Sequence, residues 1–320
     1  MTDVVLDVQG LAVDYSGLRA VDGVSFQLHA DETIGVVGES GCGKSSMGRA
    51  LVHMPGPSAG TVTYRGTNMA TLTASELRRA RLDIQMVFQD PRSSLHPLWT
   101  IEQIVSEPLR IWKIGTKAER REKVREMLIA VGLDPEVHGP RRPSELSGGQ
   151  CQRVAIARAL VAGARVLVCD EPISSLDVSL RATVLNLLEE LKVKLGLSIV
   201  FIAHDLAVVR NVSDRILVMY LGTVVEAGPA AEVFDNPQHP YTRALIASVP
   251  TVDADDSGPA AIVGEPPSPL DVPSGCRFRA RCPFAQDICA EVAPEPTIVG
   301  ENHVANCHFV GGELSLQRVA

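Results

Sequence analysis

Apolar residues alternate with polar ones along the beginning of the chain. They recur at every second position from Val4 to Tyr15, as in a half-buried pair of strands, and again from Val24 to Leu28. Thr33–Val37 is a continuous apolar run that ends in a glycine-rich loop, which is typical of a buried central strand feeding a helix. Thr61–Tyr64 predicts a further hairpin arm.

The middle of the chain carries helical patterns and two short apolar runs. Residues 118–133 place apolar side chains three and four positions apart, which predicts an amphipathic helix ending near Gly132 and Pro135. The runs Val166–Cys169 and Ser198–Ala203 each follow a helical pattern. This alternation indicates a parallel sheet with crossover helices, so the predicted fold class is α/β.

The composition of the chain changes after Gly228, because 12 of the 21 prolines fall in the last 92 residues. Proline interrupts helices and central strands, so we expect only short elements there. We place a domain boundary near residue 235, which gives domains at residues 1–235 and 236–320. The acidic residues 253–256 predict a solvated linker.

Length, charge and hydropathy exclude several classes of protein. With 320 residues, 45% hydrophobic and 21% charged, the chain has the composition of one large globular domain with an appendage. A net charge of −8 gives no broad attraction to phosphate backbones, so we expect no nucleic acid partner. No apolar run reaches the ~18 residues of a membrane-spanning helix, and residues 1–10 lack the features of a signal peptide.

The segment GESGCGKS at residues 38–45 fits the pattern GxxxxGK[ST] between a predicted strand and a predicted helix. Glycines let backbone amides surround an anion, Lys44 would reach the β- and γ-phosphates of a nucleotide, and Ser45 would bind Mg²⁺. The alternative is a glycine-rich turn with an incidental lysine. The expected phosphate-binding residues are Gly38, Ser40, Gly41, Cys42, Gly43, Lys44, Ser45 and Ser46.

Two adjacent carboxylates, Asp170 and Glu171, follow the apolar run Val166–Cys169. Open α/β sheets bind ligands at the carboxyl ends of their strands, and two neighbouring acids are costly without a cation. Asp170 would hold Mg²⁺ through water, and Glu171 would orient or polarise the water that attacks the γ-phosphate. Solvated acids at a strand end are the alternative.

LSGGQ at residues 146–150 is the most specific pattern in the chain. Its glycines precede a helical pattern at Val154–Leu160, which predicts a second helix N-terminus directed at phosphate. The loop at residues 38–45 would already bind the phosphates of one nucleotide. A second phosphate-directed helix N-terminus therefore implies that a second protein molecule faces the first.

Together with Gln89, Asp177 and His204, these motifs resemble the ATPase subunits of ATP-binding cassette (ABC) transporters, in order over about residues 4–235. The resemblance implies a RecA-like parallel sheet core, an antiparallel β subdomain, and a helical subdomain at about residues 90–165 that receives the coupling helices of membrane subunits. It also implies that two cassettes face head to tail, each ATP lying between the loop of one and the LSGGQ of the other.

The resemblance assigns roles at the interface between cassettes. Ser147 and Gly149 would touch the γ-phosphate bound by the partner, with Gln150 completing the motif. Asp177 would communicate across the interface.

Three further residues carry roles by the same resemblance. Gln89 would reach Mg²⁺ and the attacking water, His204 would sense the γ-phosphate, and Tyr15 would stack on adenine. Read alone, each has an ordinary explanation: His204 as a core histidine, Gln89 as a loop amide, and Tyr15 as a core aromatic.

Two cysteines depart from what many members of this family carry. Cys42 lies inside the phosphate loop, where helix-terminal charge would lower its pKa and make it reactive; simple structural filler is the alternative. Cys151 follows LSGGQ directly, where many relatives have a basic or polar residue, so a contact made by a long side chain is expected to be missing.

The segments NPQHPYTRAL (236–245), PSPL (267–270) and GCRF (275–278) resemble the C-terminal extension of oligopeptide, dipeptide and nickel importer ATPases. This implies an ATPase that powers peptide import from the cytoplasmic face of the inner membrane. The implied partners are a second, different ATPase subunit, two transmembrane permease subunits and an extracytoplasmic peptide-binding protein. A nickel or other small-solute importer ATPase, and a soluble non-transport ABC ATPase, remain alternatives.

Four of the seven cysteines, Cys276, Cys282, Cys289 and Cys307, cluster near the end of the chain. Their spacing fits neither a zinc ribbon nor a bacterial ferredoxin, but thiolates suit an iron–sulfur cluster that would staple a segment too small to build a core. The resemblance to peptide-importer ATPases implies a four-iron, four-sulfur (4Fe-4S) cluster. Zinc and unliganded thiols remain alternatives, with His303 and His308 as substitute ligands.

Overall fold

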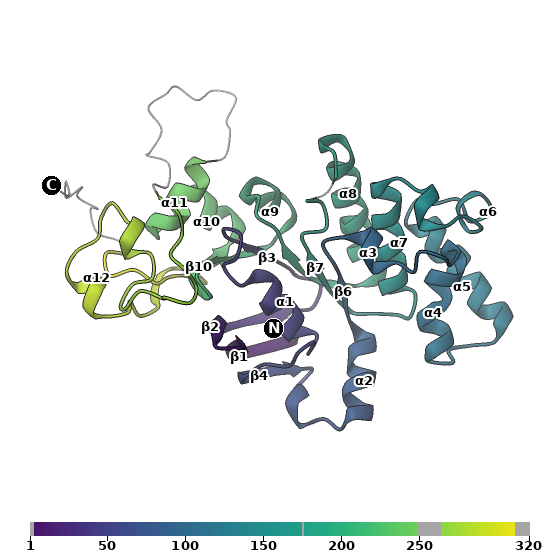
Figure 1. The fold of residues 1–320 in the computed structure, drawn as a ribbon, viewed down its shortest axis with the longest axis horizontal. Helices are drawn as coiled ribbons and strands as arrows, with labels where there is room; N and C mark the ends of the chain where they lie inside the picture. Colours follow the sequence, from purple (N-terminus) through teal and green to yellow (C-terminus); the bar gives the residue numbers. More distant parts are fainter. Residues whose placement is uncertain (1–2, 175, 249–263, 311–320) are drawn as a thin grey trace. The chain divides into compact units, whose positions relative to one another are not determined.

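The computed structural model describes residues 3–174, 176–248 and 264–310. The chain divides into two compact units, each assembled from segments far apart in sequence. The first unit comprises Met1–Val5, Leu28–Glu32 and Tyr64–Val200, and the second comprises Leu6–Gln27, Thr33–Thr63 and Phe201–Ala320. Figure 1 labels the helices and strands along the chain.

One sheet of the second unit places β1 (Val4–Tyr15) between β2 (Leu18–His29) and β4 (Ala59–Tyr64). Ser16 and Gly17 join β1 to β2 with φ angles of 45° and 91°. Two positive φ angles in a two-residue connection form the tight turn of an antiparallel hairpin. The predicted strands at Val24–Leu28 and Thr61–Tyr64 are thus confirmed.

The alternating pattern from Val4 to Tyr15 belongs to one strand of 12 residues, so the expectation of a strand pair was wrong. Gln9 and Gly10 are both exposed, and Gly10 has a φ of 57°. A residue inserted at this point shifts the alternation from even to odd positions, as in a β-bulge. The exposed pair Gln9–Gly10 therefore interrupts the alternation without ending the strand.

The other sheet of the second unit contains, as successive neighbours, β11 (Thr297–Gly300), β12 (His303–Ala305), β10 (Thr223–Pro229), β9 (Arg215–Tyr220) and β3 (Thr33–Val37). β3 and β9 run parallel, whereas β9–β10, β10–β12 and β11–β12 are antiparallel pairs. All five residues of β3 are buried, as its apolar run predicted. The C-terminal residues thus extend the sheet that includes β3.

Short helices complete the second unit. None of the described elements after residue 229 is longer than eight residues, as the proline content predicted. The helices are α1 (Lys44–Leu51), α9 (Leu206–Val212), α10 (Ala230–Asp235), α11 (Pro240–Ala247), the 3₁₀ turn Arg279–Arg281 and α12 (Ile288–Glu291).

The first unit pairs β6 (Ile84–Val87) with β7 (Val166–Asp170) in parallel, Met86 lying opposite Val168. The division between the units passes through β8 (Ser198–Ile202), whose five residues are buried. The remaining elements of this unit are β5 (Thr67–Asn68), the 3₁₀ turn Met69–Thr71, α2 (Ala74–Asp83), α3 (Pro91–Ser94), α4 (Ile101–Ile111), α5 (Lys117–Ala130), α6 (Pro135–His138), the 3₁₀ turn Pro143–Glu145, α7 (Gly148–Leu160) and α8 (Val178–Leu195).

Residues 90–165 contain helices and no strand. Thr100 and Thr116 begin α4 and α5 with capping boxes, in which a hydroxyl and a side chain three positions later satisfy each other's backbone amides. Helix α5 confirms the helix predicted at 118–133. The expected domain limits at 90–165, 1–235 and 236–320 stay predictions, since the two units group the chain differently.

Within the described part of the chain, no helix is both long and apolar enough to span a membrane.

Candidate nucleotide-binding site

The loop at residues 38–45 joins β3 to α1, as the sequence predicted. Gly38 and Gly43 have φ angles of 156° and 102°. A Cβ atom on either residue would lie 2.2 Å from a backbone oxygen, that of Met219 or of Ala20. Glycine is therefore required at both positions, and the backbone can wrap closely around a ligand.

Lys44 begins α1 and is almost fully buried, with 4% of its surface exposed. Its Nζ donates hydrogen bonds to the backbone oxygens of Gly38 at 2.7 Å and Glu39 at 2.9 Å. The N-cap of α1, Gly43, supplies no side-chain cap. An ammonium group and the amides of a helix N-terminus thus face the same loop, which is the composition of an anion site.

Cys42 is buried within this loop, with 3% exposure. Burial raises the pKa of its thiol, and the lowering influence of Lys44 is smaller. The expectation of a reactive thiolate with a lowered pKa was therefore wrong, because loss of solvation outweighs the nearby positive charge. Cys42 fills space in the loop.

Tyr15 and His204 belong to the same unit as the loop. The ring of Tyr15 is half-buried, and its hydroxyl is buried without a hydrogen-bond partner among the described residues. His204 follows β8 and is exposed. Its exposure excludes the core-histidine interpretation, whereas adenine stacking by Tyr15 and phosphate sensing by His204 stay predictions.

The acidic residues lie at the end of β7 in the first unit. Asp170 is the last residue of the strand and is 3% exposed. Glu171 follows with a φ of 46°, and its backbone oxygen accepts a hydrogen bond from Ser174 Oγ at 3.0 Å. The side chain of Gln89 donates from Nε2 to Oε2 of Glu171 at 2.9 Å. Two carboxylates and an amide oxygen form a donor set that suits Mg²⁺.

Ser147 is the N-cap of α7, the helix that follows the LSGGQ pattern. Its Oγ accepts from Gln150 N at 3.2 Å, and Gln150 Oε1 accepts from Ser147 N at 2.9 Å. This capping box uses the hydroxyl only as an acceptor, so its hydrogen can still be donated to an anion. Ser147 is exposed and Gly149 is buried. The predicted helix N-terminus is confirmed.

Asp177 and Cys151 differ sharply in exposure. Asp177 is exposed and precedes α8 without making a side-chain cap. Cys151 is fully buried, and its thiol donates to the backbone oxygen of Pro143 at 3.5 Å. Cys151 therefore packs inside the first unit.

The site residues that the sequence predicted fall into two groups, each described within its own unit. Tyr15, the loop residues from Gly38 to Ser46, and His204 belong to the second unit. Gln89, Asp170, Glu171, Ser147, Gly149, Gln150 and Asp177 belong to the first unit. Within these groups, the structure brings Gln89 to Glu171, Ser147 to Gln150, and Lys44 to the backbone of its own loop.

All seven cysteines are free thiols. Burial raises the pKa of the Cys282 thiol to about 12, and smaller contributions from Cys276, Cys307 and Cys289 are included in that value. Burial likewise raises the pKa values of Cys276 and Cys307, and Cys289 adds to both. The four C-terminal thiols thus lie within electrostatic range of one another. Among the described residues, no three His, Cys, Asp or Glu residues converge tightly enough to hold a single metal ion.

Sequence reasoning missed three residues around the phosphate loop: Glu39, Tyr241 and Arg281. Tyr241 and Arg281 hydrogen-bond to Glu39 from positions more than 200 residues away in the chain. No local pattern signals such contacts.

Comparisons with known proteins agree with the motifs. A family model described as "ABC transporter" matches residues 21–174, and one described as "Oligopeptide/dipeptide transporter, C-terminal region" matches residues 225–289. The oligopeptide transport ATP-binding protein OppF of Salmonella typhimurium is 50% identical over 281 residues, which are 87% of this chain and 84% of that protein. The oligopeptide transport ATP-binding protein AppF of Bacillus subtilis is 47% identical over 296 residues, covering 91% of this chain and 90% of its own.

Solved structures show the same fold. CbiO1 from Clostridium perfringens, part of the ABC transporter complex CbiONQ, has a TM-score of 0.67 and 30% identity, covering 73% of this chain and 92% of its own. The ATP-binding cassette MJ0796, solved as a dimer bound to ADP and phosphate, has a TM-score of 0.64 and 30% identity, covering 70% of this chain and 98% of its own. This chain therefore belongs to the ABC-type ATPases, in the group that carries the oligopeptide/dipeptide transporter C-terminal region.

Proposed function

We propose that this chain hydrolyses ATP to power the import of dipeptides or oligopeptides through an ABC transporter. The observation that carries the proposal is the length of the similarity. Proteins named for oligopeptide transport are 47–50% identical to it over 87–91% of the chain, and the similarity includes its C-terminal region. The cassette alone would support only an ABC-type ATPase.

The nucleotide would be held by the phosphate loop. Lys44 would leave its two backbone partners to bind the β- and γ-phosphates, and the amides at the start of α1 would surround the anion. Tyr15 would stack on adenine. Mg²⁺ bound by Ser45, Gln89 and Asp170 would neutralise charge on the phosphates.

Glu171 would act on the water that attacks the γ-phosphate. Its hydrogen bond from Gln89 and its backbone bond from Ser174 hold the carboxylate and its backbone in place. A carboxylate fixed in this way can orient a water molecule without first being ordered itself. His204 would contact the γ-phosphate and respond to its loss.

A second ATPase subunit would complete each site. Ser147 and Gly149 would contact the γ-phosphate bound by the partner, and exposed Asp177 would lie at the interface. The hydroxyl hydrogen that the Ser147 cap leaves unused supports this role. The dimer of MJ0796 with ADP and phosphate supports a two-subunit arrangement. Binding of two ATP molecules would close the pair, and hydrolysis would reopen it.

The remaining partners follow from the same proposal. Two transmembrane permease subunits would receive the ATPase pair at the cytoplasmic face of the inner membrane. An extracytoplasmic peptide-binding protein would deliver the solute. The second ATPase subunit would be a different chain, so that the pair is a heterodimer.

Cys276, Cys282, Cys289 and Cys307 would hold a 4Fe-4S cluster. Each thiolate of such a cluster binds a different iron, so its ligands need not converge as tightly as those of one ion. The mutual influence of these thiols on their pKa values is compatible with a shared group of this kind. Iron and sulfide analysis of anaerobically purified protein, with its visible absorbance, tests this. Colourless, iron-free and fully folded protein would reject the cluster.

The transport role is tested by reconstituting the chain with its permeases, second ATPase and binding protein in lipid vesicles. Peptides should stimulate ATP hydrolysis and accumulate inside the vesicles. Stimulation by nickel alone would indicate a nickel importer. Failure of the chain to copurify with permeases would favour a non-transport ABC ATPase.

A further inference from the structure

Glu39, the second residue of the phosphate loop, is bound by an arginine from the C-terminal region. Arg281 donates from Nη1 to Glu39 Oε2 at 2.6 Å and from Nη2 to Glu39 Oε1 at 2.8 Å. The Arg281 side chain is 6% exposed and that of Glu39 is 25% exposed. Such a two-point pair fixes orientation as well as charge, and burial protects it from solvent screening.

The backbone of Glu39 is held as well. Its N–H donates to the hydroxyl of Tyr241 at 2.9 Å, while its oxygen accepts from Lys44 Nζ. Tyr241 is completely buried, and its ring centroid lies 4.7 Å from that of Tyr220 and 5.3 Å from that of Phe278. Residues beyond position 235 therefore fix both the backbone and the side chain of this loop residue.

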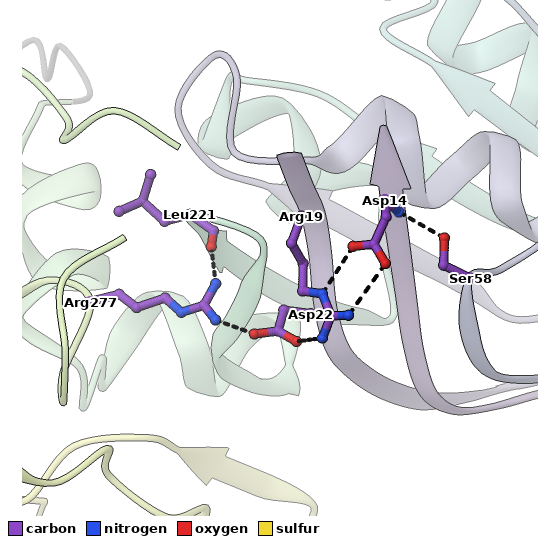
Figure 2. A network of polar contacts seen from close by, with 6 residues as sticks. All are labelled: Asp14, Arg19, Asp22, Ser58, Leu221 and Arg277. Carbon is purple, nitrogen blue, oxygen red and sulfur yellow. Dashed lines mark hydrogen bonds and ion pairs between the residues drawn. The ribbon is translucent and has the colours of Figure 1, made fainter. Parts of the chain in front are cut away.

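A second arginine, Arg277, contacts strand β2, which follows Tyr15. Figure 2 shows Arg277 donating to the backbone oxygen of Leu221 and to the carboxylate of Asp22 on β2. Asp22 also accepts from Arg19 at 3.2 Å, and Arg19 in turn pairs with Asp14 at 2.9 Å.

The turn after Leu221 is itself tied to the phosphate loop. Gly222 N donates to the backbone oxygen of Cys42 at 2.9 Å, and Gly222 O accepts from Asp22 N at 2.8 Å. The contact of Arg277 with Leu221 thus supports a backbone segment that touches both β2 and the loop.

Both arginines are direct neighbours of clustered cysteines: Arg277 follows Cys276, and Arg281 precedes Cys282. We infer that the cysteine-bearing segment 276–282 is a structural part of the nucleotide site, in which Arg281 positions the phosphate loop and neutralises Glu39, with Arg277 as a second support. This inference rests on the proposed binding of ATP at that loop.

The negative charge of Glu39 gives Arg281 an electrostatic role in nucleotide binding. A carboxylate in the phosphate loop repels a polyanionic nucleotide unless a cation compensates it, and Arg281 supplies that cation. Removing Arg281 leaves the carboxylate uncompensated and the loop less ordered. Removing the carboxylate as well should restore much of the affinity, which a purely structural loss would not allow.

The test compares equilibrium binding of Mg-ATP by the full-length chain and three variants. Arg281→Met should raise the Kd for ATP by at least about tenfold, the effect expected for losing a hydrogen-bonded charge. Glu39→Gln/Arg281→Met should recover most of that loss. Arg279→Met is the matched control, because Arg279 lies in the same segment but its side chain bonds only to exposed Ser274 among the described hydrogen bonds. Thermal unfolding of each variant reports whether it is folded.

The outcomes separate the inference from the proposed function. The inference is supported if the parent and Arg279→Met bind ATP tightly and Arg281→Met binds it weakly. The double variant should then recover most of the lost affinity. The inference is overturned if Arg281→Met and Arg279→Met bind ATP with equal affinity. It is also overturned if the double variant binds ATP as weakly as Arg281→Met. Either result leaves the ATPase proposal intact. If the parent itself binds no ATP, both proposals fail.

Discussion

The Nε2 of Gln89 donates a hydrogen bond to Oε2 of Glu171 over 2.9 Å, joining residues that lie 82 positions apart. Gln89 lies in the loop after β6, and Glu171 follows β7, its parallel neighbour. The adjacent carboxyl ends of these two strands thus place an amide on the carboxylate proposed to act on water.

Glu171→Gln should retain ATP binding and lose nearly all hydrolysis. The amide is close in size to the carboxylate but cannot accept a proton or polarise water as strongly, so we expect a fall in kcat of at least about 100-fold. Steady-state phosphate release and equilibrium ATP binding measure the two properties. Glu190→Gln removes an exposed acid of α8 and serves as the control. Full turnover by Glu171→Gln would remove Glu171 from its role.

Two substitutions at Ser147 should separate its cap from its proposed phosphate contact. Ser147→Ala removes the acceptor for Gln150 N and should lower the free energy of unfolding by about 1 kcal/mol. Ser147→Asp restores a cap acceptor but places a negative charge where the partner's γ-phosphate is expected. It should be nearly as stable as the parent, yet hydrolyse ATP at least about tenfold more slowly.

Urea unfolding and ATP hydrolysis of the assembled ATPase pair give the two readouts for Ser147. Ser144→Ala, an exposed serine outside any cap contact among the described hydrogen bonds, is the control. Full hydrolysis by Ser147→Asp would contradict the phosphate contact.

Cys42 should resist alkylation in the folded chain. The thiolate is the reactive form, and burial both raises the pKa of this thiol and shields it from reagent. Iodoacetamide near neutral pH should label Cys42 slowly in native protein and rapidly after denaturation in guanidinium chloride, as measured by peptide mass spectrometry. Equal rates in the two states would show that the loop opens readily.

Acid should destabilise the second unit through His239. Burial lowers the pKa of His239 from 6.5 to about 3, with a further contribution from Arg243. The unfolded imidazole gains a proton as the pH falls below 6.5, whereas the folded one stays neutral until near pH 3. The contribution of neutral His239 to stability is therefore complete above pH 6.5. As the pH falls from 6.5 toward about 3, the free energy of unfolding decreases by up to about 1.4 kcal/mol per pH unit.

His239→Asn isolates this effect. The imidazole Nδ1 accepts from Tyr241 N at 3.0 Å, and an asparagine oxygen can replace that acceptor without titrating. Urea unfolding of both proteins between about pH 7.5 and pH 4.5 should show the parent losing stability more steeply than the variant. Parallel curves would refute the role of His239.

Local patterns were enough to predict much of the fold. The buried strand Thr33–Val37, helix α5 and the start of helix α7 after the LSGGQ pattern depend on neighbouring residues, whose spacing is visible in the sequence. The phosphate loop is likewise local, because its glycines respond to backbone constraints within a few residues.

Contacts made by distant segments were beyond such reasoning. The sequence around Cys42 suggested a helix-terminal thiolate, yet the pKa of this thiol depends mainly on burial, which is a property of the packed unit. The bond from Arg281 to Glu39 spans 242 positions. No sequence pattern around Arg281 or Glu39 indicates that the two residues are partners. Only the folded chain reveals that the cysteine-bearing segment supports the loop.

The most direct test of the account is the rate of ATP hydrolysis measured together with the molecular mass of the active species. The chain, mixed with its second ATPase subunit, should hydrolyse ATP only in the fraction of molecules that have associated, and Lys44→Ala should remove its own site. Hydrolysis at the full rate by a chain that stays monomeric throughout turnover would contradict a site completed by two protein surfaces.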